Sequence, residues 1–172
     1  MRKSVAGLAA VMTLVSVVPG CAMTSTTVEG AGTLAPFKAE AGSGGPAVRD
    51  GGLAFAVSDV SRAQQVGDPE DPGRSVTARG VFVVFTLAID NVGSAPLTFI
   101  DRDQTLIDDS GRAFSPSMAA NIYGNPGIRS TTIDPGDGLV VRISFDVPTD
   151  TVPRDLILRG SSSSDGVTVA VP

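Results

Sequence analysis

The longest regular pattern of apolar positions in the chain runs from Val81 to Asn91, after Gly80 and before the turn signal Asn91-Val92-Gly93. Its β-branched and aromatic residues predict the central strand of an all-β domain. Alternate positions share a face of a strand, and the positions that we expect to face the core are Val83, Phe85, Leu87 and Ile89. The opposite face becomes polar toward Asp90, so we expect the strand to leave its cover there.

Seven further segments show shorter strand patterns, and turn signals separate them. They cover residues 52–60, 97–100, 104–107, 112–115, 139–147, 155–159 and 166–171. Between the first of them and the central strand we expect a long acidic loop over residues 67–73, whose acids either form the turn or offer a docking patch. Residues 116–128 predict one helical turn at Ser117 to Asn121, followed by a loop.

About eight short strands with turn signals every 8 to 15 residues favour an all-β sandwich or barrel. The chain shows no amphipathic helix and no internal repeat, so an α/β fold is poorly supported. Twenty glycines and 12 prolines fit a turn-rich β fold. The 172 residues leave room for one domain and a targeting segment.

The first 20 residues resemble a secretory signal peptide. Arg2 and Lys3 form a basic region, and an apolar stretch runs from Val5 to Val18. As a helix this stretch would span about 21 Å, which is short of the roughly 30 Å of a bilayer core. We therefore expect residues 1–20 to be a signal peptide and not a membrane span.

The only cysteine of the chain follows this stretch, in the sequence Val18-Pro19-Gly20-Cys21. The sequence resembles a bacterial lipobox, although Pro19 replaces the usual Ala or Ser before the glycine. The resemblance implies that Cys21 receives lipid, such as palmitate, and holds the protein to the outer face of the cell membrane. The alternative is a chance thiol near an ordinary cleavage site.

Residues 21–47 are rich in Ala, Gly, Ser, Thr and Glu and predict a flexible linker, which would leave residues 48–172 as the folded domain. A linker of about 25 residues spans roughly 28 Å, enough to hold a domain clear of the lipid headgroups. Leu34 and Phe37 are its bulky apolar residues. They either make no contact, which the sequence alone favours, or dock on the domain as an extra edge segment.

Charge and composition exclude several functions. The formal net charge is −5, and a chain without Arg2 and Lys3 would be more acidic still, which argues against nucleic acid as a partner. Without histidine and with one cysteine, the chain cannot form a Ser-His-Asp triad, a Cys-His pair, a histidine-based zinc site or an intrachain disulfide. We expect neither a cofactor nor an enzymatic activity.

Four carboxylates lie within nine residues around the predicted hairpin, namely Asp101, Asp103, Asp108 and Asp109. Such a group can bind a hard cation such as calcium or share acid and base roles. However, the spacing lacks the ligands of a calcium loop, so turn formation is the favoured interpretation, and a salt bridge from Arg112 to Asp108 or Asp109 is expected. Ile122 and Tyr123 are either a buried loop anchor or a contact for a partner.

Several of these motifs together resemble a known family. They are Gly80 with Phe82 to Asn91 and Gly93, Leu106 to Asp108 with Gly111 to Phe114, Ile133 with Pro135 and Gly136, Phe145 to Pro148, and Leu156 to Leu158. They look like the uncharacterised extracellular domain of Gram-positive, actinobacterial lipoproteins, which is akin to the mycobacterial immunoprotective extracellular protein. The resemblance covers about residues 50–172 and implies an immunoglobulin-like antiparallel β-sandwich, and it carries no catalytic residues.

The first hypothesis for function is a cell-surface lipoprotein with a non-catalytic module that binds an envelope protein or glycan or associates with the envelope. The alternative is a cation or small-ligand binding protein that uses the acidic hairpin at residues 101–109. A carboxylate-dependent hydrolase is disfavoured, because nothing in the sequence pairs two acids with a nucleophile or an oxyanion loop.

Overall fold

The structure, a computed structural model, describes residues 46–171 except 69, 127 and 129. The strands of this part of the chain are β1 (Val48–Asp50), β2 (Leu53–Gly67), β3 (Ser75–Asn91), β4 (Leu97–Ile100), β5 (Thr105–Asp108), β6 (Ala113–Phe114), β7 (Ser130–Ile133), β8 (Gly138–Val147), β9 (Pro153–Leu158) and β10 (Val167–Ala170). The helical elements are the 3₁₀ turns η1 (Pro72–Arg74) and η2 (Asp101–Asp103) and the α-helix α1 (Met118–Gly124).

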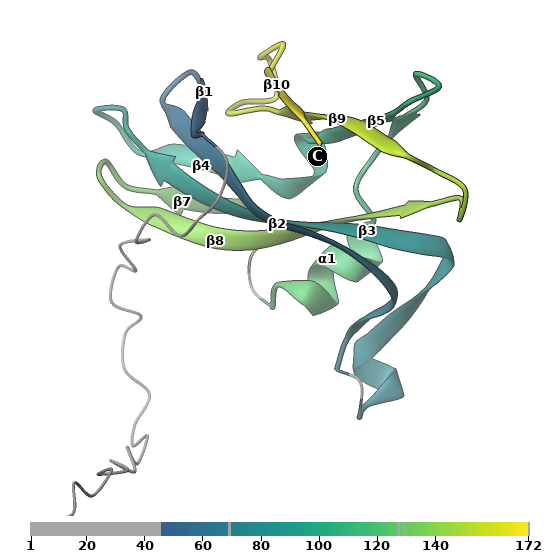
Figure 1. The fold of residues 1–172 in the computed structure, drawn as a ribbon. Coiled ribbons are helices and arrows are strands. Elements are labelled where there is room, and N and C mark those ends of the chain that lie inside the picture. Colours follow the sequence, from purple (N-terminus) through teal and green to yellow (C-terminus); the bar gives the residue numbers. More distant parts are fainter. Residues whose placement is uncertain (1–45, 69, 127, 129, 172) are drawn as a thin grey trace, which may run out of the picture. The chain divides into compact units, whose positions relative to one another are not determined.

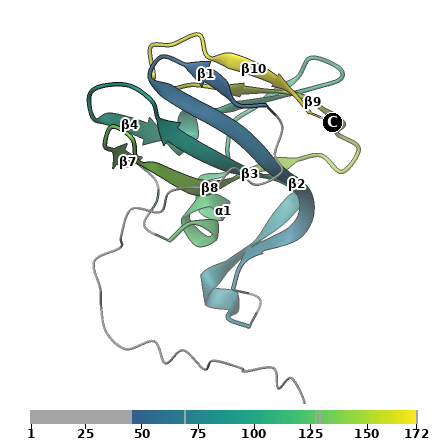
Figure 2. The same cartoon turned by 60° about the vertical axis from the view of Figure 1, so that its left-hand side comes forward.

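Two four-stranded antiparallel sheets form the two layers of the domain (Figure 1). Sheet 1 has the strand order β1-β2-β3-β8, and sheet 2 has the order β10-β9-β5-β6, while β4 and β7 form a separate pair. Figure 2 shows the same layers turned, with α1 on the outer side of sheet 1. The predicted immunoglobulin-like antiparallel β-sandwich is confirmed, with ten strands in place of about eight. The two extra strands, β1 and β7, are only three and four residues long.

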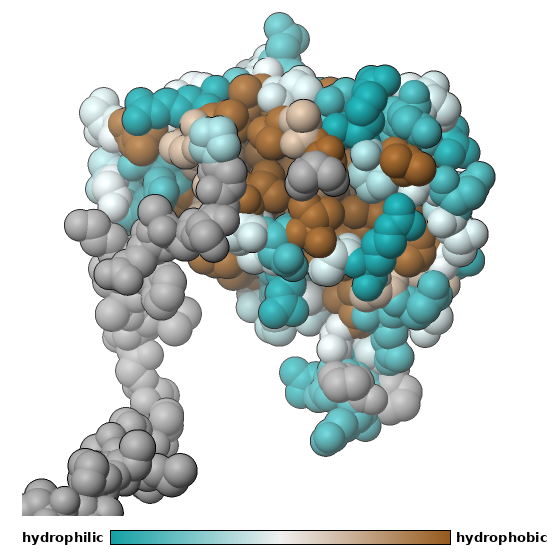
Figure 3. Space-filling view, in the orientation of Figure 1, coloured by the Kyte–Doolittle hydropathy of each residue, from teal (hydrophilic) through white to brown (hydrophobic). Residues whose placement is uncertain are grey.

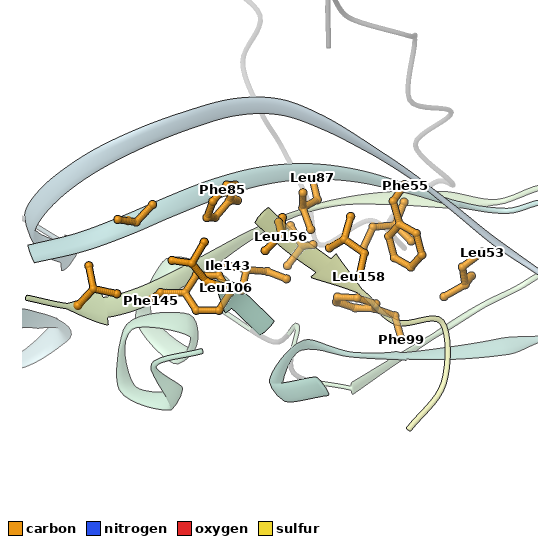
Figure 4. Packing of buried hydrophobic residues seen from close by; sticks show 14 of the residues in the cluster. Leu53, Phe55, Phe85, Leu87, Phe99, Leu106, Ile143, Phe145, Leu156 and Leu158 are labelled. Carbon is orange, nitrogen blue, oxygen red and sulfur yellow. The ribbon is translucent and has the colours of Figure 1, made fainter. Parts of the chain in front are cut away.

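Strand β3 is the centre of sheet 1, where it pairs with β2 on one side and β8 on the other. The four residues predicted to face the core, from Val83 to Ile89, are completely buried. The rings of Phe85 and Phe145 meet edge to face with centroids 5.8 Å apart, and Phe55 and Phe99 lie 6.4 Å apart (Figure 4). The interior between the sheets is therefore apolar and carries aromatic pairs that add to the hydrophobic stabilisation.

The opposite face of β3 loses cover toward Asp90, as the sequence predicts, because its positions from Thr86 onward are only half-buried. Phe82 and Val84 are buried in a second apolar cluster with Ala120 of α1. Helix α1 continues through Tyr123 to Gly124, so the expected loop at these two residues was wrong. The Ser117 hydroxyl caps this helix by accepting a hydrogen bond from the backbone N–H of Ala120. Sheet 1 is thus covered on both faces around Phe82.

Strands β2 and β3 form a longer hairpin than predicted. The strand expected over residues 52–60 extends to Gly67, and β3 begins at Ser75 instead of Val81. The loop expected over residues 67–73 corresponds to the connection over residues 68–74, which contains η1. Register shifts at Val57/Asp59 and at Ala63/Gln65 interrupt the alternation and conceal the full length of β2. Asp68 and Asp71 accept hydrogen bonds from backbone N–H groups two residues further on, which confirms their turn-forming role.

Helix α1 also satisfies the outer edge of sheet 1. The side chain of Asn125 accepts a hydrogen bond from the N–H of Arg142 and donates one to its carbonyl. The Asn121 side chain accepts from the N–H of Ser144, and the N–H of Ser117 donates to the Ser144 carbonyl. These contacts replace a neighbouring strand along β8, which would otherwise be an unpaired edge.

None of the helices in the described residues is long and apolar enough to cross a membrane. The predicted signal peptide at 1–20, Cys21 and the linker up to residue 45 lie outside the described residues. The proposed boundary at residue 48 coincides with the first residue of β1.

Truncation of the central aromatic pair should destabilise the domain strongly. Phe85→Ala removes a fully buried ring and leaves a cavity, so the free energy of unfolding should fall by about 3–5 kcal/mol. Val140→Ala on β8, where the valine is 44% exposed, is the control and should change it by no more than about 0.5 kcal/mol. Urea denaturation measures both, and equal losses would contradict the assignment of Phe85 to the core.

Candidate functional site

A groove opens between the edges of the two sheets, where β2 and β10 lie. Strand β1 pairs only with Leu53 to Phe55, so from Ala56 onward no described strand pairs with β2 on the side away from β3. Strand β10 is the edge of sheet 2 and has only four residues. Among the described residues the sandwich is therefore open along this side, because the short strands β1 and β10 cover only part of the long strand β2.

Apolar side chains make up most of the groove. Its volume is about 1040 Å³. The residues that form its apolar lining include Val57, Val60, Phe85, Leu156, Val169 and Val171. Phe85 and Leu156 also belong to the core, whereas Val57, Val60, Val169 and Val171 are only partly buried. Figure 3 shows a hydrophobic area in the middle of this face, surrounded by hydrophilic side chains. Such a surface favours an apolar occupant over water.

Polar contacts close the groove at both ends. At one end, the Asp50 carboxylate of β1 accepts hydrogen bonds from the Gly160 N–H at 2.6 Å and from the Ser164 hydroxyl, which joins β1 to the loop before β10. At the other end, the Arg62 guanidinium donates to the carbonyl of Thr151, which precedes β9. The part of β2 that lines the groove lies between Phe55 and Arg62.

Two charged residues line the groove, Asp59 and Arg62. Asp59 is exposed and takes part in none of the ion pairs among the described residues. Arg62 binds a backbone carbonyl and likewise faces no carboxylate within salt-bridge distance in this part of the chain. The rim therefore carries one negative and one positive charge, and neither forms an ion pair among the described residues.

The predicted salt bridge of the hairpin is formed between Arg112 and Asp108. The Arg112 Nε lies 2.6 Å from Oδ2 of Asp108, whose side chain is fully buried. The same carboxylate accepts hydrogen bonds from the Ser110 hydroxyl and from the Arg112 N–H. Desolvation raises the pKa of Asp108, but these hydrogen bonds and the charge of Arg112 outweigh it and lower the pKa to about 2. Asp108 thus stabilises its own turn.

The other three carboxylates of the acidic hairpin lie in separate surroundings. Asp101 is 7% exposed, accepts a hydrogen bond from the Asn121 side chain at 3.2 Å, and lines a second cavity of about 440 Å³ with Arg102 and Met118. Asp103 accepts from the Ser162 hydroxyl at 2.6 Å, and Asp109 is exposed. Among the described residues, no three acidic, histidine or cysteine side chains are close enough together to hold a metal ion.

Ile122 and Tyr123 lie on α1 and not in a loop. They are 38% and 37% exposed, and Met118 on the same helix is 60% exposed. Tyr123 lies beside Gly67, because a Cβ atom at Gly67 would be 3.1 Å from the Cβ of Tyr123. Helix α1 packs against β2 and β3, and the partner-binding role of both residues remains a prediction.

Sequence patterns did not reveal the groove. Val57, Val60 and Val169 each belong to a strand predicted by alternation, but alternation does not tell which strand edges remain unpaired. The sequence feature that came nearest to indicating a groove was the pair of bulky apolar residues Leu34 and Phe37 in a linker of mostly small and polar residues. Docking of this pair on the domain was one of its two interpretations.

The fold and groove define the class of the protein as an immunoglobulin-like β-sandwich with an open edge. Within this class the chain belongs to the family called domain of unknown function DUF4352, whose model matches residues 43–169. No curated protein matches the chain. The expected resemblance to an uncharacterised domain is thereby confirmed at the level of the family.

Solved structures support the fold at low sequence identity. A conserved hypothetical protein of Bacillus anthracis has a TM-score of 0.54 and 12% identity, covering 71% of this chain and 92% of that chain. The secreted protein MPT63 of Mycobacterium tuberculosis has a TM-score of 0.52 and 18% identity, and the match covers 69% of this chain and 82% of that chain. The yjhA protein of Bacillus subtilis has a TM-score of 0.50 and 14% identity, and the match covers 71% of this chain and 83% of that chain. These similarities establish a shared architecture.

The Asp108 contacts should make stability depend on pH. Because the pKa of Asp108 is lowered from 3.8 to about 2, its contribution is complete above pH 4 and is lost as the pH falls toward 2. Asp108→Asn should therefore be less stable than the natural protein at pH 7, and the difference should shrink between pH 4 and pH 2. Urea midpoints at pH 7, 4 and 2.5 measure the difference in stability between the two proteins, and Asp109→Asn, at an exposed position, is the control. A difference that does not vary with pH would contradict the role of the Asp108 charge.

Proposed function

We propose that the chain is an extracytoplasmic lipoprotein whose β-sandwich binds an extended apolar segment of another envelope protein, without catalysis. The observation that carries this proposal is the apolar groove beside the unpaired stretch of β2. A polypeptide is the occupant that this surface suits best, because its backbone can pair with the free edge of β2 while its side chains fill the apolar lining.

The lining argues for a polypeptide over a glycan or an acyl chain. Glycans bind through polar side chains and exposed aromatic rings, yet the aromatic residues of the groove, Phe55 and Phe85, are buried. An acyl chain would fill the apolar lining but leave the N–H and C=O groups along β2 without partners. Asp59 and Arg62 at the rim add charges that a polypeptide can match.

The extracytoplasmic address rests on the amino-terminal sequence. Arg2 and Lys3, the apolar stretch from Val5 to Val18 and the lipobox-like residues before Cys21 support export and lipidation. MPT63, which shares the fold, is a secreted protein. A membrane anchor at Cys21 and a linker over residues 21–47 would hold the binding groove above the surface of the cell.

The proposed lipidation predicts a specific loss of label. Cells that express the protein and grow with a palmitate analogue should label it, and Cys21→Ser should abolish the label, since this is the only thiol in the chain. Fractionation should at the same time move the variant protein out of the lipid-anchored pool. Ala22→Ser, a change of the next residue, is the control and should keep the label. Label that survives in Cys21→Ser would rule out the anchor.

Binding in the groove predicts position-specific cross-linking in cells. A photo-crosslinking amino acid at Ser61, which is exposed and lines the groove, should capture an extended apolar segment of one envelope protein. The same amino acid at Val140, on the outer face of β8, should not capture that segment. A synthetic peptide of the captured segment should then bind the natural protein and lose most of its affinity for Val57→Lys.

Three outcomes would contradict the binding proposal. One is an identical set of products from Ser61 and Val140. Another is capture of glycan or lipid alone at Ser61. The third is a captured segment whose peptide binds the natural protein and Val57→Lys equally well.

A further inference from the structure

We infer that the groove has an occupant within the same chain, the tether segment, which we define as residues 34–40 with the sequence Leu-Ala-Pro-Phe-Lys-Ala-Glu. The sequence alone left two alternatives for Leu34 and Phe37, no contact or docking on the domain. The position and lining of the groove favour docking. This inference uses the groove of the proposed function but requires no outside partner.

The chain enters the described structure at the groove itself. Pro46, the first described residue, is one of the residues that line it. Phe37 is nine residues earlier, and a flexible glycine-rich chain of that length spans about 15–18 Å. The open stretch of β2 from Val57 to Arg62 is about 17 Å long at 3.3 Å per residue. The tether segment can therefore reach the whole groove at a high effective concentration.

The apolar residues of the tether segment match the lining of the groove. Leu34 and Phe37 are the only leucine and the only aromatic residue between Cys21 and Pro46. Their neighbours in the sequence are small, charged or proline. Partly buried valines on both walls of the groove, including Val57 and Val169, offer apolar partners to these two side chains.

The charges of the tether segment also complement the rim. Lys38 and Glu40 follow Phe37 at alternate positions, so they share a face in an extended conformation. The groove carries Asp59 and Arg62, neither of which has an oppositely charged partner in the described residues. The tether segment and the groove each carry one positive and one negative side chain. Opposite charges could therefore pair when the segment docks.

The backbone of the segment suits an edge position. A proline disfavours helical conformation at the residue before it, so Pro36 favours an extended segment, and its missing N–H is tolerated at a sheet edge. The glycines at 42, 44 and 45 and then Pro46 disfavour a simple continuation of β1 along β2. They allow the chain to turn and place residues 34–40 over the groove. The register shift at Ser58 limits a long second strand from another copy, whereas a short segment fits beside it.

A single tryptophan tests the docking directly, because the chain has none. In the full chain, Phe37→Trp should show blue-shifted emission and several-fold weaker quenching by acrylamide than Val28→Trp, a control in the same linker outside the tether segment. Adding Val169→Lys to Phe37→Trp should return both values to those of Val28→Trp. Adding Val140→Lys, on an exposed valine of β8, should leave them unchanged.

Each control excludes another occupant or a folding artefact. Thermal unfolding must confirm that the Val169→Lys protein is folded, and Val57→Lys on the opposite wall serves as the second groove variant. Emission of Phe37→Trp equal to that of Val28→Trp would overturn the inference. A blue shift that disappears on dilution would point instead to a second copy, and one that both groove variants retain would point to detergent or lipid.

The outcomes separate this inference from the proposed function. A shielded indole in the Phe37→Trp protein, without any cross-linked envelope segment at Ser61, would support self-docking and reject the outside partner. An exposed indole together with a cross-linked segment would reject self-docking and support the outside partner. If both hold, the partner peptide should displace the tether segment and restore acrylamide quenching of the Phe37→Trp protein.

Discussion

The two edges of sheet 1 must satisfy backbone N–H and C=O groups, and they do so in different ways. Along β8, side chains of Asn121 and Asn125 and the N–H of Ser117 take the place of a neighbouring strand. On the side of β2 away from β3, pairing in the described residues stops after Phe55. An apolar strand edge without a neighbour can pair with another segment, and the proposals above start from this stretch of β2, which has no neighbour among the described residues.

The groove follows from unequal strand lengths around a shared core. Strand β2 has 15 residues, whereas β1 has three and β10 has four, so the sheets cannot close along its whole length. Phe85 and Leu156 support both the core and the floor of the groove, and this double role makes the floor rigid. Rigidity lowers the entropic cost of binding an extended segment. The hydrogen bonds of Asp50 and Arg62 fix the two ends of the groove across the sheets.

Sequence patterns predicted the parts of the fold that depend on local periodicity. The alternation from Val83 to Ile89 marked the core face correctly, and the turn around Asp108 was correctly placed with its Arg112 salt bridge. The length of β2 was missed because the register shift at Ser58 breaks the alternation. The length of α1 was missed because Asn121 in the helix and Asn125 at its C-cap act through contacts with β8, which lies further along the chain. The candidate site was harder to predict for the same physical reason. The groove depends on which strand edges meet across the sandwich, and no short stretch of sequence contains that information.

The proposed docking of the tether segment would connect the proposed lipid anchor to the groove. A chain held by lipid at Cys21 would reach the groove through residues 34–40, so the segment nearest the domain would act both as tether and as ligand. Docking would shorten the free linker and bring the domain toward the membrane, while release would lengthen it and expose the edge of β2. A competing segment from another protein would therefore change both the occupancy of the groove and the height of the domain, because the same residues determine the two quantities.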